Sequence, residues 1–171
     1  IKLLIKRINK MTKKESMTLY QGLNKLGNLK GVKFAYAVSK NITALQKEMD
    51  ILDKSYEGSE RFKKFELERL ELVKKFAKKN DQGGFMIKDG QYELEDEKAF
   101  NEAFENLKKE NQEVVDEREK QMTEFNALMA TESDITLFKI AFTDVPADIS
   151  VNQMHSISPI IEEATESPYA K

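Results

Sequence analysis

The side chains that most often perform catalysis or bind metals are scarce in this sequence of 171 residues. It contains one histidine, His155, and no cysteine. Disulfides, thiolate metal sites and thiol nucleophiles are therefore excluded. A metal site would need His155 together with carboxylates, but no Asp or Glu stands three or four positions from it. We expect no metal and no other cofactor.

Carboxylates are abundant, but their spacing is that of an exposed helix face and not of an acid–base pair. Glu71, for example, stands three and four positions before Lys74 and Lys75, the spacing at which helical side chains form ion pairs. Gly83 and Gly84 precede an expected strand and do not open a helix, so they do not form a phosphate-binding loop. The sequence therefore predicts a protein that is not an enzyme.

Basic side chains gather at the start of the chain. Residues 1–14 hold six of the 28 basic residues and none of the 30 acidic ones, namely Lys2, Lys6, Arg7, Lys10, Lys13 and Lys14. An apolar stripe at helical spacing accompanies them. This pattern fits a basic amphipathic arm that contacts a membrane surface, nucleic acid or a partner groove, and it also fits a helix that packs on this protein or a copy of it.

The charge of the remaining chain limits which part of the protein could bind nucleic acid. The rest of the chain is acidic, and phosphate neutralisation dominates nucleic-acid binding. Nucleic acid would therefore be bound only through the arm. We also expect the arm to contribute little to the stability of the body.

Two long stretches, 32–79 and 96–130, carry the 4-3 spacing of helices that pair as a coiled coil. Gly58 interrupts the first as a kink or a break. Between them, Asp89-Gly90 predicts the turn of a β-hairpin over 85–94. The two stretches should therefore run antiparallel. The side chains expected to be buried between them are Val38, Leu45, Leu52, Phe104, Leu107 and Phe125.

The other segments complete the predicted fold. The spacing predicts a helix over 15–29, a strand over 134–143, and two short C-terminal turns of helix that begin near Ser150 and Ser158. The fold class is mainly α with a small β element: a long antiparallel helical hairpin, coiled-coil-like, with a β-hairpin at its tip and one C-terminal strand. The expected domains are a basic arm (1–14), a helical-hairpin domain (15–163) and a flexible tail (164–171). No apolar run is long enough to predict a transmembrane segment.

Two groups of residues suggest surfaces for a partner. Asn111 and Arg118 occupy positions in the 96–130 pattern where apolar residues are usual, and polar residues there commonly select register and partner. Phe62, Phe65 and Phe76 form a second apolar face, which the 96–130 helix is not expected to cover while it also faces the 38–56 stripe. We predict that these five residues bind another chain. The edge of strand 134–143 would pair with the β-hairpin or with another chain.

The order of these features resembles a known family. Lys33-Phe34-Ala35-Tyr36-Ala37-Val38-Ser39-Lys40-Asn41 opens the first long stretch, Asp96-Glu97-Lys98-Ala99-Phe100-Asn101 follows the β-hairpin, and Ser156-Ile157-Ser158-Pro159-Ile160-Ile161 forms a short Ser-Pro helix. This order is similar to that of an uncharacterised protein family of tailed bacteriophages and prophages, over residues 15–163. The 57–80 stretch is longer than in that family, and the arm has no counterpart. The resemblance implies a phage origin, with no known enzymatic activity and no functional residues.

Three functions agree with these observations. The first is a virion structural or assembly component that contacts copies of itself or other phage proteins. The second is a phage-encoded regulator or inhibitor that binds a host protein, for example a defence protein, in the host cytoplasm. The third is nucleic-acid binding through the arm. A thin helical hairpin buries little apolar area alone, so we expect stable contacts with another chain in either of the first two functions.

Overall fold

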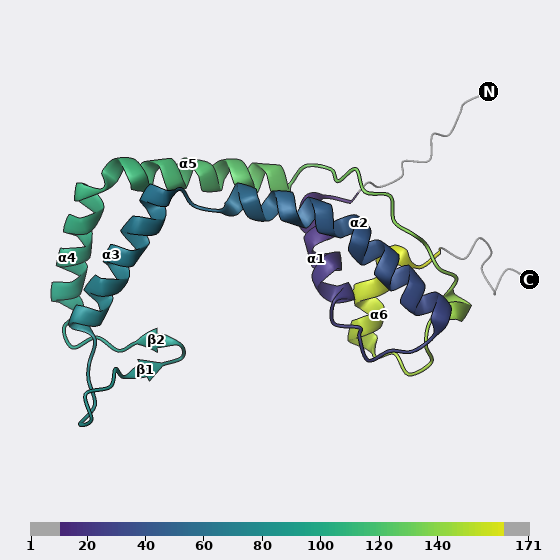
Figure 1. Cartoon of the computed structure of the whole chain (residues 1–171), viewed down its shortest axis with the longest axis horizontal. Coiled ribbons are helices and arrows are strands. Elements are labelled where there is room, and N and C mark those ends of the chain that lie inside the picture. The colour runs from purple at the N-terminus through teal and green to yellow at the C-terminus, as the bar shows by residue number, and fades with distance from the viewer. Residues whose placement is uncertain (1–10, 163–171) are drawn as a thin grey trace, which may run out of the picture. The chain divides into compact units, whose positions relative to one another are not determined.

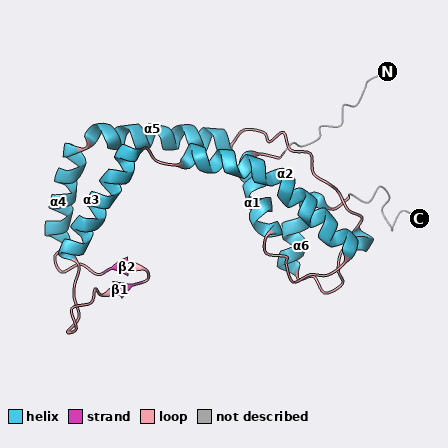
Figure 2. Ribbon diagram, in the orientation of Figure 1, coloured by secondary structure: helices cyan, strands magenta, loops and turns pink. Residues whose placement is uncertain are grey.

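The computed structural model describes residues 11–162, and Figure 1 shows the elements in order. Within that range the chain is mainly helical with one two-stranded antiparallel sheet (Figure 2), which confirms the prediction of a mainly α fold with a small β element. The chain divides into two compact units: unit 1, of residues up to 55 and from 125 onward, and unit 2, of residues 56–124. The elements are α1 (Lys13–Leu23), α2 (Val32–Tyr56), α3 (Glu60–Phe76), β1 (Ile87–Lys88), β2 (Gln91–Tyr92), α4 (Glu97–Glu110), α5 (Gln112–Met129), η1 (Phe142–Asp144), α6 (Val151–Ile157) and η2 (Ser158–Ile160).

The apolar core of unit 1 lies where α1, α2, α6 and η2 meet. Its buried members are Leu19, Leu23, Leu26, Leu29, Phe34, Ala37, Leu45, Ile140, Ile157 and Ile160. Helix α1 packs directly on α6 (Figure 1). Their approach is close because Gly22 lies at the contact: a Cβ atom there would stand 2.9 Å from the Cβ of Ser156. The core therefore depends on a residue without a side chain at this crossing.

A buried asparagine ties the extended segment after α5 to helix α2. Asn41 is fully buried. Its Nδ2 donates to the carbonyl oxygens of Ala37 and Phe138, and its Oδ1 accepts from the backbone N–H of Phe138, with all three bonds at 2.9 Å. An asparagine side chain offers a donor and an acceptor like those of a neighbouring strand. Asn41 therefore takes the place of a paired strand for this part of the chain.

The predicted strand over 134–143 is wrong. The segment is extended, but residues 142–144 form the 3-10 helix η1, and the only bridge within the described part of the segment joins Ile140 to Ile161. The N–H of Ile140 donates to the carbonyl of Ile160, and its carbonyl accepts from the N–H of Glu162. The backbone groups expected to pair with a strand are instead used by Asn41 and by the end of the described chain.

The predicted long helices are each two helices. The first breaks at residues 57–59, between α2 and α3, and the second breaks at Asn111, between α4 and α5. Leu45 and Leu52 are buried as predicted, but four expected core residues are only half-buried: Val38, Phe104, Leu107 and Phe125. The buried stripe of α2 contains Phe34, Ala37, Asn41, Leu45, Met49 and Leu52, so it departs from the predicted stripe in the first half of the helix, where Ala37 is buried in place of Val38.

The boundary of the predicted arm also changes. Helix α1 begins at Lys13, and Thr12 caps it in a reciprocal arrangement with Glu15. The backbone and hydroxyl hydrogen bonds from Thr12 lower the pKa of the Glu15 carboxyl. The Nζ of Lys13 donates to the carbonyl of Glu132 at 2.7 Å. Lys13 is therefore part of unit 1.

Of the remaining basic residues of the predicted arm, one lies within the described residues 11–162 and four lie outside them. Lys14 is exposed on α1. Lys2, Lys6, Arg7 and Lys10 lie outside the described residues, as does the predicted tail.

Replacement of Asn41 should destabilise unit 1. Asn41→Ala leaves the N–H and carbonyl of Phe138 without their side-chain partner, so we expect the free energy of unfolding to fall by about 2–3 kcal/mol. Urea denaturation followed by circular dichroism measures this. The control Asn28→Ala, at an exposed position before α2, should leave the midpoint nearly unchanged. Equal midpoints for both variants would contradict the role given to Asn41.

The crossing of α1 and α6 offers a second test. Gly22→Ala places a methyl group against Ser156 and should destabilise the protein by about 1–3 kcal/mol through overpacking. Gly27→Ala is the matched control, because nothing lies within 4 Å of a Cβ at that position. Thermal unfolding of the two variants gives the comparison. A Gly22→Ala protein as stable as the control would contradict the claim that the core depends on the absence of a side chain at this crossing.

Candidate functional site

A row of phenylalanine rings joins α3 to α4 in unit 2. The Phe65 and Phe104 ring centroids lie 6.5 Å apart, and those of Phe76 and Phe100 lie 6.0 Å apart. Since the position along α3 rises as the position along α4 falls, the two helices run antiparallel. Phe65 is buried. The expectation that the second helical stretch would leave this aromatic face uncovered is therefore wrong for Phe65, and Phe76 is half-buried against α4.

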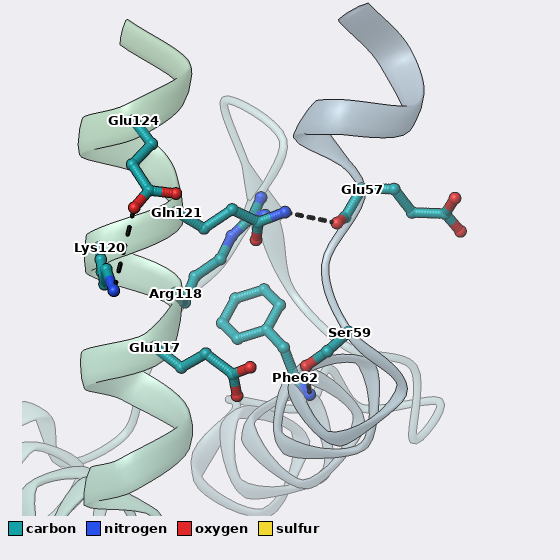
Figure 3. Close-up of a pocket in the computed structure, with 8 residues that line it drawn as sticks. All are labelled: Glu57, Ser59, Phe62, Glu117, Arg118, Lys120, Gln121 and Glu124. Carbon is teal, nitrogen blue, oxygen red and sulfur yellow. Dashed lines mark hydrogen bonds and ion pairs between the residues drawn. The ribbon is translucent and has the colours of Figure 1, made fainter. Parts of the chain in front are cut away.

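The last predicted aromatic contact, Phe62, lies beside Arg118 at the start of α3. The guanidinium group of Arg118 stands 4.9 Å from the ring centroids of both Phe62 and Tyr56. Its Nη1 donates to the carbonyl of Tyr56 at 2.6 Å, and Nε2 of Gln121 donates to the carbonyl of Glu57 at 2.9 Å (Figure 3). Arg118 thus binds the carbonyl group of the last residue of α2, where positive charge is favourable.

The hollow around Arg118 has a volume of about 420 Å³ and is lined mainly by polar side chains (Figure 3). Hydrogen bonding from Lys63, with its charge, lowers the pKa of the nearby Glu57 carboxyl. Gly58 is needed in the turn, because a Cβ there would stand 2.6 Å from a ring carbon of Phe62. These contacts hold the turn between α2 and α3, which is a structural use of Arg118 within its own chain.

Asn111 also serves its own chain. Its backbone N–H donates to the carbonyls of Leu107 and Lys108, and its side chain donates to that of Leu107. It therefore ends α4, and α5 starts at the next residue. The interpretation of Asn111 as a register-selecting residue in a continuous helix is wrong, because the helix is not continuous there.

A β-hairpin projects from the ends of α3 and α4, and a set of backbone hydrogen bonds anchors its base. Ala77 is buried and pairs with Leu94 in a bridge. The N–H of Lys78 donates to the carbonyl of Glu93, that of Glu93 to Met86, and that of Met86 to Lys78, at 2.8–2.9 Å. This closed cycle joins three segments of backbone at one point. The hairpin therefore has a defined conformation relative to the ends of α3 and α4.

The two turns of the hairpin follow from local residue types. Asp89 and Gly90 have φ values of 50° and 79°, so the predicted turn with two left-handed residues is confirmed. In the preceding loop, Oδ1 of Asn80 accepts from the N–H groups of Gln82 and Gly84. Side chain and backbone thus order both turns without any burial.

The hairpin is ordered but almost entirely exposed. Every residue from 78 to 91 is exposed. The run includes three consecutive apolar side chains, Phe85, Met86 and Ile87, with exposed fractions of 38%, 41% and 63%. Phe85 is held by an edge contact with Tyr92, at 5.4 Å between centroids. Soluble proteins seldom expose three apolar residues in succession unless another molecule covers them.

Sequence reasoning placed the hairpin but did not identify these three residues as a site. The signal was present: a strand with one buried face alternates apolar and polar residues, and Phe85-Met86-Ile87 does not alternate. Consecutive residues point to opposite faces, so both faces of the hairpin are apolar. We call residues 77–95 the projecting hairpin from here on, and it is the candidate site.

Unit 1 has a separate apolar groove of about 380 Å³ between the start of α2 and the extended segment. Val32, Tyr36 and Phe138 line it, and the rings of Tyr36 and Phe138 meet edge to face at 5.6 Å. The ion pair of Lys33 with Asp144, at 3.0 Å, crosses one side. Lys139 and Glu162 also line the groove.

Among residues 11–162, no three His, Asp or Glu side chains gather as metal ligands would. No helix in that range has both the length and the apolar character of a membrane span.

Comparison of the chain with protein-family models, with curated proteins and with solved structures found no match. The resemblance to a bacteriophage family therefore stays a prediction.

The contacts of Arg118 predict a stability effect. Arg118→Ala removes the donor to the Tyr56 carbonyl and the stacking on two rings, so we expect a loss of about 1–3 kcal/mol in the free energy of unfolding. Arg118→Lys should recover little of it, because an ammonium group does not stack as a planar guanidinium does. Lys120→Ala is the control, since its contact with Glu124 is exposed and 4.0 Å long. Full stability of the Lys variant would contradict the stacking argument.

Proposed function

We propose that this protein acts through contacts with other protein chains and not by catalysis, as a structural or assembly component of a bacteriophage. The observation that carries the proposal is the projecting hairpin, which exposes Phe85, Met86 and Ile87 in an ordered backbone. The phage setting comes from the sequence resemblance alone.

The order of the hairpin supports a binding role. A contact element that is already in its bound conformation loses little conformational entropy on association. The projecting hairpin meets this condition, because Asn80, the Asp89-Gly90 turn and the backbone cycle at its base order it although residues 78–91 are exposed. An apolar strand with an open edge is also prone to pair with another chain.

Helices α3 and α4, from whose ends the hairpin projects, support it. All described residues of α4 are half-buried or exposed, although the helix is strongly amphipathic. Contacts between α3 and α4 through the phenylalanine row thus serve mainly to hold the two helix ends together. The hairpin begins and ends at those helix ends, so the row positions the exposed apolar residues.

Replacing one apolar residue of the hairpin should impair assembly without unfolding the protein. Ile87→Glu introduces a charge at a 63% exposed side chain, so we expect an unchanged unfolding midpoint and a fall of tenfold or more in the yield of infectious particles in a complementation assay. Leu67→Glu is a closely matched control, because Leu67 is an aliphatic residue of α3 with 64% exposure. Only the hairpin variant should lose yield.

The assembly role has its own measurement. Mass spectrometry of purified particles should find the protein at a fixed copy number. Absence from the particle, with normal yield from the Ile87→Glu variant, would contradict the proposal and favour a regulator of a host protein.

A further inference from the structure

We infer that the projecting hairpin binds the projecting hairpin of a second copy of this chain, in a two-fold symmetric contact. The inference rests on the proposed function, since it names the partner of the same surface. It is based on the apolar centre of the hairpin and on the charges that border it.

The apolar centre fits a second hairpin because both of its faces need cover. Ile87 and Phe85 point to one face and Met86 to the other, and all three are exposed. A flat protein surface covers one face of a two-stranded ribbon. A second hairpin of the same kind can cross or flank the first and cover parts of both of its faces. An isolated hairpin is also at the limit of stability in water, so pairing adds to its stability.

Charges of opposite sign border the apolar centre on the two segments that lead into and out of the hairpin. Lys78 and Lys79 stand on the incoming segment, and Glu93 and Glu95 stand on the outgoing one. Within residues 11–162 none of these four side chains forms an ion pair, although the ammonium group of Lys79 lies 5.7 Å from the ring centroid of Phe85. They therefore have charge available for a partner.

Two-fold symmetry makes this arrangement complementary to itself. In such an interface residue i of one copy meets residue j of the other, and j meets i. The incoming lysines of each copy can then face the outgoing glutamates of the other. A border of one sign would repel its own copy, whereas this border attracts it twice.

The size of the surface sets the expected strength. A stable interface takes about 20–30 residues from each partner, and the projecting hairpin supplies fewer. The contact should therefore be a concentration-dependent dimer, with association shifting across the micromolar range. Several such contacts in an assembly would act together.

Charge reversal tests the contact directly. Light scattering behind a sizing column should give a dimer for the natural chain at high micromolar concentration. The Lys78→Glu, Lys79→Glu variant and the Glu93→Lys, Glu95→Lys variant should each be monomeric there, because each repels its own copy. An equimolar mixture of the two should form a dimer again, since the reversed borders attract each other. Leu67→Glu should dimerise like the natural chain.

Cysteine cross-linking tests the geometry by a second route that does not depend on the charges. The chain has no cysteine, so a single Gln91→Cys forms a disulfide only with its copy. Such a bond requires Cα atoms within about 7 Å. We expect rapid cross-linking at Gln91, in β2, and none for Asn106→Cys, at an exposed position along α4.

Three results would overturn the inference: a monomeric natural chain at all concentrations, a mixture that stays monomeric, or cross-linking at Asn106 and not at Gln91. These results are separable from the proposed function. A monomer whose Ile87→Glu variant still loses particle yield keeps the assembly role and assigns the hairpin another partner chain. A dimer whose Ile87→Glu variant leaves particle yield normal keeps the contact and removes the assembly role.

Discussion

The double hydrogen bond between Asn41 and Phe138 is the contact on which the order of unit 1 depends most. It joins residues 97 positions apart in the chain. The extended segment passes beside α2 without a paired strand, and a buried backbone left without partners would cost more than its apolar side chains return. The asparagine supplies those partners. With the segment in place, Ile140 enters the core and receives the last described residues of the chain through the bridge to Ile161.

Unit 2 is organised by a different interaction, the contact of aromatic rings between two helices. The row is thin. Phe65 is the one buried residue of α3, so α3 and α4 hold each other by ring contacts more than by a deep core. The two ends of the hairpin are held at a fixed spacing by Phe76 and Phe100. Tyr92 and Lys79 contact the Phe85 ring, but the apolar residues of the hairpin stay exposed.

Much of the local structure could be predicted from residue types, and the reason is that neighbours in sequence decide it. Asp89-Gly90 forms the predicted left-handed turn because both residues tolerate positive φ. Asp96 caps α4 through the N–H of Ala99, and Ser150 caps α6, as their positions before apolar helical runs predict. The non-alternating run at residues 85–87 was also readable, but its exposure was not.

The tertiary structure decided what periodicity leaves open. Asn111 and Arg118 stand at regular seam spacings, yet Asn111 ends a helix and Arg118 binds a carbonyl at the end of another. The same spacing serves a continuous helix or a broken one, and only long-range contacts distinguish them. The 134–143 segment has the composition of a strand, but a strand also needs a neighbouring strand to pair with. The side chain of Asn41 takes the backbone hydrogen bonds of Phe138 instead. Thus the sequence by itself determined the caps, the turn and the helical class, because these depend on local sterics and hydrogen bonds. The break at Asn111, the choice of a break over a kink at Gly58, the buried face of α2 and the exposure of the hairpin depend on which surfaces meet, and only the folded chain decides that.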